Sequence, residues 1–261
     1  MNVVIHESFG GWRKITLNRP DRLNSLNAEL KQQLLGALSE AAADESCRAL
    51  LITGAGRGFC AGEDLSACSG ELGQDTPNFR EALEQFYNPA ALSIRKMEKP
   101  VVCAVNGVAA GAGATLALSC DMVIAARSAK FIQAFSSIGL TPDAGGTWLL
   151  PRMVGDARAR GLVLLGEVIT AEQAEHWGMI WQVVDDALLN EEATILTQTL
   201  AARPTRALAS AKALLDRSFQ TDLSGQLEAE TTSQENMGNT QDYKEGVQAF
   251  LSKRPPVFSG C

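Results

Sequence analysis

The chain has 261 residues, of which 46% are hydrophobic and 20% are charged, a balance that predicts a packed core and excludes wholesale disorder. Its formal net charge of −7 at pH 7 argues against a nucleic-acid partner, because proteins hold nucleic acids mainly through Lys and Arg on phosphates. The same charge disfavours binding to an anionic membrane surface. A small anionic ligand held by a local basic cluster remains compatible with it.

The N-terminal segment and the cysteines favour a cytoplasmic protein. Residues 1–9 have neither the basic nor the apolar region of a secretory signal. The six cysteines form no C-x-x-C pair, and Cys103 and Cys120 lie in apolar runs that are typical of small core residues. We therefore expect a chain that works in the reducing cytoplasm.

Strands and helices alternate along the first half of the chain. Trp12–Leu17 has the pattern of a strand, and Asn27 can cap a helix whose apolar residues recur at spacings of three and four. Further strands are expected at 49–53, 101–105, 122–126 and 130–134, helices at 80–97 and 111–119, a glycine-rich loop at 54–62 and a mobile polar loop at 66–78. The recurrence of strand, turn and helix predicts an α/β fold, a spiral of β-β-α repeats.

The run 101–120 is long and apolar enough to resemble a membrane span. However, Pro100 and the pair Asn106-Gly107 interrupt it, and its first residues are β-branched. We therefore interpret it as a buried strand, a turn and a helix of small residues. No membrane partner is expected.

The C-terminal part is mostly helical. Thr170 and Gln173 form a capping box that begins a helix, and a late strand is expected at 180–184. From residue 188 onward the pattern is helical, with a break at Pro204. We expect residues 1–190 to form the substrate-binding core and residues 191–261 to form a helical region for subunit contacts.

Several common chemistries lack their motifs in this sequence. There is no G-x-S-x-G turn and no P-loop, and the glycines at 54, 56 and 58 depart from the dinucleotide fingerprint. The two histidines, His6 and His176, lie near the N-terminus and on an expected surface helix. Because clusters of metal-ligand residues are also absent, we expect neither a metal nor a cofactor.

Asp143 is the only charged residue between Lys130 and Arg152. An unpaired carboxylate among apolar residues is costly to bury, and burial raises its pKa toward neutrality, where it can take and return a proton. The alternative is that Asp143 caps a helix from the turn 142–146, which is the commoner role for an acidic residue in a loop.

Two glycine-rich turns, 58–65 and 106–113, each follow an expected strand. Small residues let a ligand approach the backbone, so one N–H group from each turn could form an oxyanion hole, and the dipole of the helix that begins near Gly111 would assist. For either turn alone, tight packing is the commoner reason for such residues.

Together, F-C-A-G-x-D-L at 59–65, N-G-x-A-x-G-A-G at 106–113 and G-L-x-P-D-x-G-G-T at 139–147 resemble the crotonase (enoyl-CoA hydratase/isomerase) family. The resemblance extends from Asn18 to Arg254. It implies a crotonase-like spiral with a C-terminal helical region. It also implies an acyl-CoA substrate and no separate cofactor, because coenzyme A is part of the substrate. It also implies a homotrimer or a dimer of trimers.

The resemblance implies that the backbone N–H groups of Glu63 and Ala112 polarise the thioester carbonyl. It implies that Asp143 moves a proton or, as in dehalogenase relatives, acts as a nucleophile. The two glutamates of the hydratases correspond to Thr115 and Phe135 here, so hydration is not expected. Substrate or CoA contacts are expected from Arg22, Ser25, Leu26, Ala61, Asp64, Leu65, Phe135, Trp148 and Lys253. Phe135 and Trp148 could instead simply pack in the core, since aromatic residues are commonly buried there. Arg22 and Lys253 could instead be ordinary surface charges in contact with water.

The runs 106–118, 125–131, 147–152 and 177–186 are similar to family members that isomerise a ring epoxide of phenylacetyl-CoA. This similarity implies conversion of the ring-1,2-epoxide to the oxepin through a thioester enolate. The alternative within the family is a Δ3,Δ2-enoyl-CoA or dienoyl-CoA isomerase. From other classes, an RNA-binding or a non-catalytic CoA-binding member of the family remains open.

Overall fold

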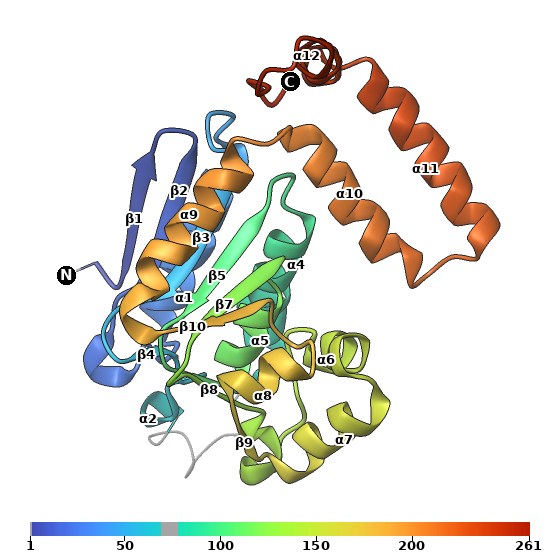
Figure 1. Cartoon of the computed structure of the whole chain (residues 1–261). Coiled ribbons are helices and arrows are strands. Elements are labelled where there is room, and N and C mark those ends of the chain that lie inside the picture. Colours follow the sequence, from blue (N-terminus) through green and yellow to red (C-terminus); the bar gives the residue numbers. More distant parts are fainter. Residues whose placement is uncertain (1, 69–77) are drawn as a thin grey trace.

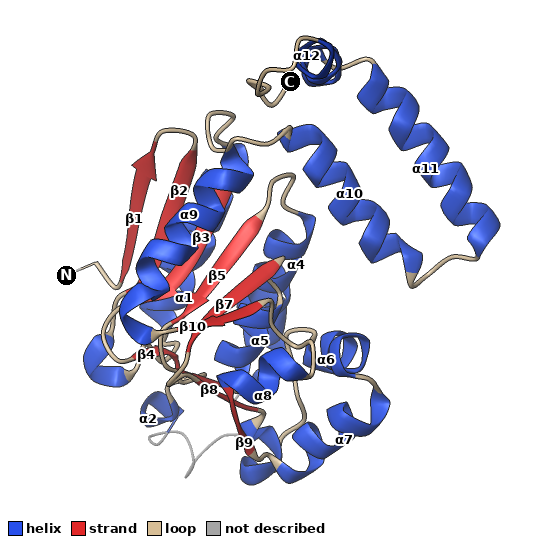
Figure 2. Cartoon of the chain, viewed as in Figure 1, coloured by secondary structure: helices blue, strands red, loops and turns tan. Residues whose placement is uncertain are grey.

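Two β-sheets organise the chain, whose computed structural model describes residues 2–68 and 78–261 (Figures 1 and 2). The larger sheet has the strand order β1-β2-β3-β5-β7-β10, in which β1 and β2 are antiparallel and the other neighbours are parallel. Its strands are β1 (Val4–Phe9), β2 (Trp12–Leu17), β3 (Ala49–Gly54), β5 (Val101–Val105), β7 (Met122–Ala126) and β10 (Gln182–Val184).

The smaller sheet has the order β4-β6-β8-β9, with β9 antiparallel to β8. Its strands are β4 (Gly58–Cys60), β6 (Val108–Ala110), β8 (Lys130–Ile132) and β9 (Val168–Thr170). Each turn of the chain gives one strand to each sheet, first β3 and β4, then β5 and β6, then β7 and β8. The predicted spiral is therefore confirmed.

Helices cover both faces of the larger sheet. Helix α1 (Ala28–Ala43) begins at the predicted cap, where the Asn27 side chain accepts a hydrogen bond from the Leu30 N–H. Helix α9 (Leu189–Ala201) packs across β3, β5 and β7. With both faces covered, β3 is buried along its whole length, as is usual for a parallel strand.

The apolar run 101–120 forms the predicted strand β5 and helix α5 (Ala112–Leu118), and the predicted turn between them also contains the short strand β6. None of the helices in residues 2–68 and 78–261 is long and apolar enough to cross a membrane. The predicted helix 80–97 is composed of α3 (Phe79–Ala82), a π-helical turn (Leu83–Tyr87) and α4 (Asn88–Lys96). The remaining helices before the C-terminal part are α2 (Leu65–Cys68), α6 (Gly146–Val154), α7 (Asp156–Leu165) and α8 (Ala171–His176).

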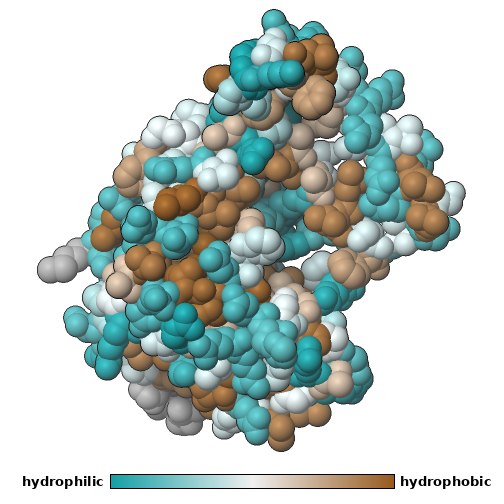
Figure 3. All heavy atoms as spheres, viewed as in Figure 1, coloured by the Kyte–Doolittle hydropathy of each residue, from teal (hydrophilic) through white to brown (hydrophobic). Residues whose placement is uncertain are grey.

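Three helices extend away from the sheets at the C-terminal end (Figure 1). They are α10 (Thr205–Ser218), α11 (Leu223–Gly238) and α12 (Gln241–Leu251). Hydrophobic residues reach the surface along these helices (Figure 3). The most exposed on these helices are Leu215, Leu223, Phe250 and Leu251, and the exposed Val257 lies after α12.

Several elements were not expected, namely the three-residue strands β4, β6 and β9, helix α7 and strand β1. Strand β1 has no counterpart among the predicted elements, because only Val4 of its six residues is buried and no alternation marks it. The start of the expected loop 66–78 belongs to α2, and residues 69–77 lie outside the described part of the chain. The predicted capping box is confirmed, since the Thr170 side chain accepts a hydrogen bond from the Gln173 N–H.

Candidate active site

Three loops meet at one edge of the smaller sheet. Strands β4, β6 and β8 are parallel neighbours, so their carboxyl ends lie at the same edge, about 4.8 Å apart from strand to strand. Glu63 follows β4, Ala112 follows β6 and Phe135 follows β8 within three residues of each strand end. The spiral thus brings residues from three distant parts of the sequence together.

Glycines allow the first two loops to touch. A Cβ atom added to Gly62 would lie 2.8 Å from the carbonyl oxygen of Ala110 and 3.7 Å from the nitrogen of Ala112. A Cβ atom added to Gly113 would lie 2.3 Å from the carbonyl oxygen of Cys60. No real Cβ atom tolerates such contacts, so these glycines are required for the approach of the two turns. The peptide nitrogens of Glu63 and Ala112 therefore lie close to each other.

The Glu63 N–H points away from its neighbouring loop. Leu26 donates from its N–H to the Gly62 carbonyl at 2.7 Å and accepts from the Asp64 N–H at 3.1 Å, which forms a parallel bridge between Leu26 and Glu63. In such a bridge the central residue directs its own N–H to the opposite side. The turn that contains Ala112 lies close to the preceding residue, since a Cβ atom added to Gly62 would lie 3.7 Å from the Ala112 nitrogen.

Ala112 is the first residue of α5, and the first N–H groups of a helix have no acceptor within the helix. Gly111 precedes it with φ +51° and ψ −125°, a conformation that strongly favours glycine. An oxyanion hole needs two such N–H groups that donate to one oxygen atom, and for Glu63 and Ala112 this stays a prediction.

Asp143 does not cap a helix. Helix α6 begins at Gly146 with Gly145 as its N-cap, and no side chain makes the capping bond. The cap interpretation of the 142–146 turn is therefore wrong. The Oδ1 atom of Asp143 is buried, and no described residue donates a hydrogen bond to it.

Burial, followed by the nearby Glu63 carboxylate, raises the pKa of Asp143 to about 6, while Lys31 acts in the opposite direction. The next residue, Ala144, has a positive φ of 50°, which is strained for a residue with a side chain. Such strain is often found at functional sites, where it fixes a side chain in place. Asp143 can therefore exchange a proton near neutral pH.

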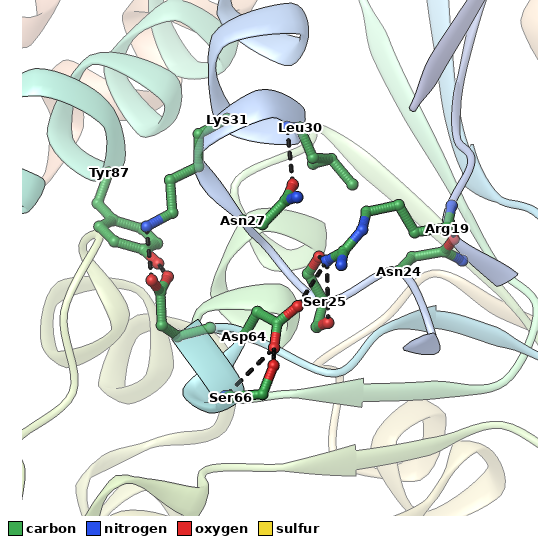
Figure 4. A network of polar contacts seen from close by, with 10 residues as sticks. Arg19, Asn24, Ser25, Asn27, Leu30, Lys31, Asp64, Ser66 and Tyr87 are labelled. Carbon is green, nitrogen blue, oxygen red and sulfur yellow. Dashed lines mark hydrogen bonds and ion pairs between the residues drawn. The ribbon is translucent and has the colours of Figure 1, made fainter. Parts of the chain in front are cut away.

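Two residues that the sequence did not point to, Lys31 and Tyr87, contact the Glu63 carboxylate and lie near Asp143. The Lys31 Nζ donates to Oε1 of Glu63 at 2.7 Å, and the Tyr87 hydroxyl donates to Oε2 (Figure 4). Burial and the charges of Glu63 and Asp143 raise the pKa of Tyr87, so its hydroxyl stays a donor. The positions of Lys31 and Tyr87 in the sequence relative to Glu63 do not predict this contact.

The expected CoA-binding segments lie side by side, joined by the Leu26 bridge and by the Ala61 N–H, which donates to the Leu23 carbonyl. Arg19 donates to both the Ser25 carbonyl and Oδ2 of Asp64 (Figure 4). Hydrogen bonds from Ser66 and Arg19 lower the pKa of Asp64 to about 2. The Asp64 side chain thus joins the two segments, while Arg22 and Leu65 are exposed.

The residues at the two hydratase glutamate positions carry no acid. The Phe135 ring lies 3.8 Å from a Cβ atom added to Gly111, and the buried Thr115 hydroxyl donates to the Gly111 carbonyl at 3.3 Å. Trp148 is half-buried in α6, with the Arg152 guanidinium 4.1 Å above its ring. Near the two glycine turns, the described residues therefore offer Asp143 and Glu63 as carboxylates.

Two cavities adjoin these residues. A small one of about 10 Å³ has Leu26, Tyr87, Ala112 and Ala144 in its lining. A larger one of about 1040 Å³ lies between α4, α6 and α10, and Trp148 lines it. Both cavities have Ala144, the residue next to Asp143, in their lining.

The structure does not bring Lys253 to this site within one chain. Lys253 follows α12, which lies at the opposite end of the molecule from β4 and α2 (Figure 1). Its side chain is exposed. A contact between Lys253 and a ligand held by this site would therefore need a second copy of the chain.

Comparison with known proteins agrees with this geometry. The chain is 52% identical over 260 residues to the 1,2-epoxyphenylacetyl-CoA isomerase of Escherichia coli K12, covering 100% of this chain and 99% of the relative. It is 33% identical to the trans-2-decenoyl-[acyl-carrier-protein] isomerase of Streptococcus mutans, with 98% of each chain covered. An enoyl-CoA hydratase structure from Polaromonas sp. JS666 superposes with a TM-score of 0.92 at 35% identity, covering 98% of this chain and 99% of that one.

The profile of the enoyl-CoA hydratase/isomerase family matches residues 9–260, which is almost the whole chain. The spiral of two sheets, the paired glycine turns and the carboxyl group beside them are all present in this matched region. The chain belongs to the enoyl-CoA hydratase/isomerase family.

Proposed function

We propose that the protein isomerises an acyl-CoA thioester, with Asp143 as the group that moves the proton. The observation that carries this proposal is the Asp143 carboxyl group, which has a buried oxygen without a donor and a pKa of about 6. It lies beside two convergent backbone N–H groups. A base with a pKa near the working pH is the most effective proton carrier.

In the proposed reaction, the thioester oxygen accepts hydrogen bonds from the N–H groups of Glu63 and Ala112. Asp143 removes a proton from the carbon next to the thioester, and the electron pair moves onto the thioester oxygen as an enolate. Charge that develops on this oxygen is stabilised by donors already in place. Asp143 then returns the proton to a different carbon, so no atom is gained or lost.

Isomerisation fits the site better than hydration does. Hydration needs one group to activate water and another to deliver a proton to carbon. Thr115 and Phe135 supply no carboxylate, and the Glu63 carboxylate is already held by two donors. A single carboxyl group is enough for a proton shuttle.

For the substrate we propose ring-1,2-epoxyphenylacetyl-CoA, which opens to the oxepin form once the enolate is delocalised into the ring. The relative that is 52% identical bears the name of this activity, and phenylacetate catabolism would be its setting. Phe135 and Trp148 would exclude water from the acyl group. The chain's likeness to a decenoyl isomerase supports a Δ3,Δ2-enoyl substrate as the second candidate.

A panel of acyl-CoA thioesters tests both candidates. We expect the purified protein to convert the ring epoxide to an isomer of unchanged mass whose NMR spectrum is that of the oxepin. Conversion of a Δ3-enoyl-CoA with the ring epoxide untouched would favour the second candidate. A product heavier by one water would contradict isomerisation.

We propose that residues 191–261 assemble the chain into a homotrimer or a dimer of trimers. Exposed apolar residues on α10–α12 support an assembly, because water contact with such surfaces is unfavourable. A neighbouring copy would also be the source of the Lys253 that approaches the CoA phosphates. Light scattering on the purified protein would give three or six times the 27.8 kDa chain mass, and a monomer would contradict the proposal.

A further inference from the structure

The side chain of Glu63 is held from two sides by residues of two different helical segments. Lys31 of α1 donates to its Oε1 atom at 2.7 Å, and Tyr87 of the π-helical turn donates to Oε2. The Lys31 ammonium also lies over the Tyr87 ring, 5.1 Å from its centre. The three side chains therefore restrict one another.

This cluster is not an ordinary surface ion pair. The exposed fractions are 16% for the Lys31 side chain and 33% for the Glu63 side chain, and Tyr87 is 7% exposed. Exposed pairs contribute little, because water screens them and their side chains lose conformational freedom. Here the aromatic rings of Phe86 and Tyr87 already restrict the lysine.

The cluster lies beside the proposed proton carrier. Tyr87, Ala112 and Ala144 line the same small cavity, and Asp143 immediately precedes Ala144. The charge of Glu63 raises the pKa of Asp143 and that of Lys31 lowers it, while the charge of Asp143 raises the pKa of Tyr87. Glu63, Lys31 and Tyr87 are thus electrostatically linked to Asp143.

We propose that Glu63 is a positioning residue. Lys31 and Tyr87 hold its side chain, which in turn orients the Glu63 peptide N–H and places a negative charge beside Asp143. This inference rests on the isomerase function proposed above. The backbone of Glu63 would serve the thioester oxygen, and its carboxylate would make Asp143 a stronger base. One residue thus couples the two halves of the site.

Two substitutions with opposite expected effects test this role. Glu63→Gln removes the negative charge, so the acidic limb of the kcat/KM profile, which reports the base in the free enzyme, should move to lower pH. Lys31→Met removes the positive charge and should move the limb to higher pH. We expect shifts of about half to one pH unit at the effective dielectric of a partly exposed site. A general loss of structure would not produce opposite shifts.

Matched variants separate the local charge from other effects. Lys31→Arg keeps the cation and should retain the wild-type limb. Glu84→Gln also removes one negative charge from the same π-helical turn as Tyr87, but Glu84 is exposed and pairs with Arg80, so no shift is expected. Equal shifts in Glu84→Gln and Glu63→Gln would overturn the proposal.

A measurement independent of activity completes the test. Carbon-13 labelling of aspartate carboxyls lets the Asp143 signal be followed by NMR, and its absence in Asp143→Asn identifies it. We expect titration near pH 6 in the wild type, lower in Glu63→Gln and higher in Lys31→Met. If both variants shift alike, or neither shifts, the cluster has no such role. If the titrations shift as expected but no acyl-CoA is isomerised, only the proposed function fails.

Discussion

Arg19 donates a hydrogen bond from Nη1 to Oδ2 of Asp64 across 2.8 Å, and this ion pair joins two loops that are 45 residues apart in the sequence. The same Arg19 nitrogen donates to the Ser25 carbonyl at 2.6 Å. These bonds hold the loop with Leu26 against the loop with Glu63. They therefore help to fix the direction of the Glu63 N–H group.

Arg19→Gln should lower both stability and activity. It leaves the buried Asp64 carboxylate without its charged partner, and we expect the free energy of unfolding at pH 7 to fall by about 1–3 kcal/mol. Because the pKa of Asp64 lies near 2, below its unfolded value, this difference should persist above about pH 4 and shrink as the pH falls toward 2. Urea unfolding at several pH values measures it.

The exposed pair of Arg80 and Glu84 provides the control for that variant. Arg80→Gln should change the unfolding free energy by less than about 0.5 kcal/mol, because pairs in water contribute little. Equal losses in the two arginine variants would show that burial of the Arg19 pair has no special effect.

Gly62→Ala should damage catalysis. The new Cβ atom would lie 2.8 Å from the Ala110 carbonyl oxygen, at a residue whose φ of +89° already disfavours a side chain. The turn must move, and the Glu63 N–H moves with it. Loss of one oxyanion donor typically lowers the rate by about 10²–10³-fold, and steady-state kinetics should detect a fall of this size.

Gly36→Ala is the matched control. Gly36 is exposed in the middle of α1, and a Cβ atom there would meet no atom within 4 Å. The substitution should leave the rate unchanged and raise stability by about 0.5–1 kcal/mol, as usual within a helix. A rate for Gly62→Ala close to that of Gly36→Ala would contradict the role of the glycine turn.

Asp143→Asn should remove most of the isomerase activity. An amide cannot accept the proton, and loss of a general base typically costs about 10²–10⁴-fold in kcat. KM should change little, because the proposed oxyanion donors and CoA-binding loops are untouched. Near-normal turnover would refute the shuttle, and a covalent substrate ester on Asp143, found by mass spectrometry of the wild type, would favour a nucleophilic role instead.

The same substitution should stabilise the protein at neutral pH. The pKa of Asp143 is about 6 in the folded chain and about 4 in an unfolded one, so the folded state favours the protonated form. Its ionisation therefore costs stability as the pH rises through 6. Discounted for partial solvent access, Asp143→Asn should be more stable than wild type by about 1–2 kcal/mol above pH 7. Below about pH 4 the gain should vanish; a less stable variant at pH 7 would contradict it.

Much of the fold is predictable because its signals are local. The Asn27 cap, the apolar spacing of the helix after it and the strand Val101–Val105 all agree with the structure. Strand β1 escapes prediction because it lies at the sheet edge with five of its six residues exposed, so it lacks an alternating pattern. Its formation depends on pairing with β2, which a local pattern does not encode.

The site is only partly predictable from the sequence. The two glycine turns and Asp143 stand out as motifs, but the cap interpretation of Asp143 could be dismissed only when α6 proved to begin at Gly146. Lys31 and Tyr87 meet Glu63 through the packing of α1 and the π-helical turn against a loop. No spacing rule along the chain predicts such a convergence.

In the proposed mechanism, the arrangement of β4, β6 and β8 as adjacent parallel strands separates the groups that hold the substrate from the group that acts on it. The ends of the first two strands supply backbone groups, whose chemistry does not depend on side-chain identity. The segment after the third strand, from Phe135 to Asp143, supplies side chains. If the proposed mechanism holds, substitutions in this segment would change the reaction while the peptides proposed to bind the thioester stay in place, so that new catalytic activities would arise without a new binding site.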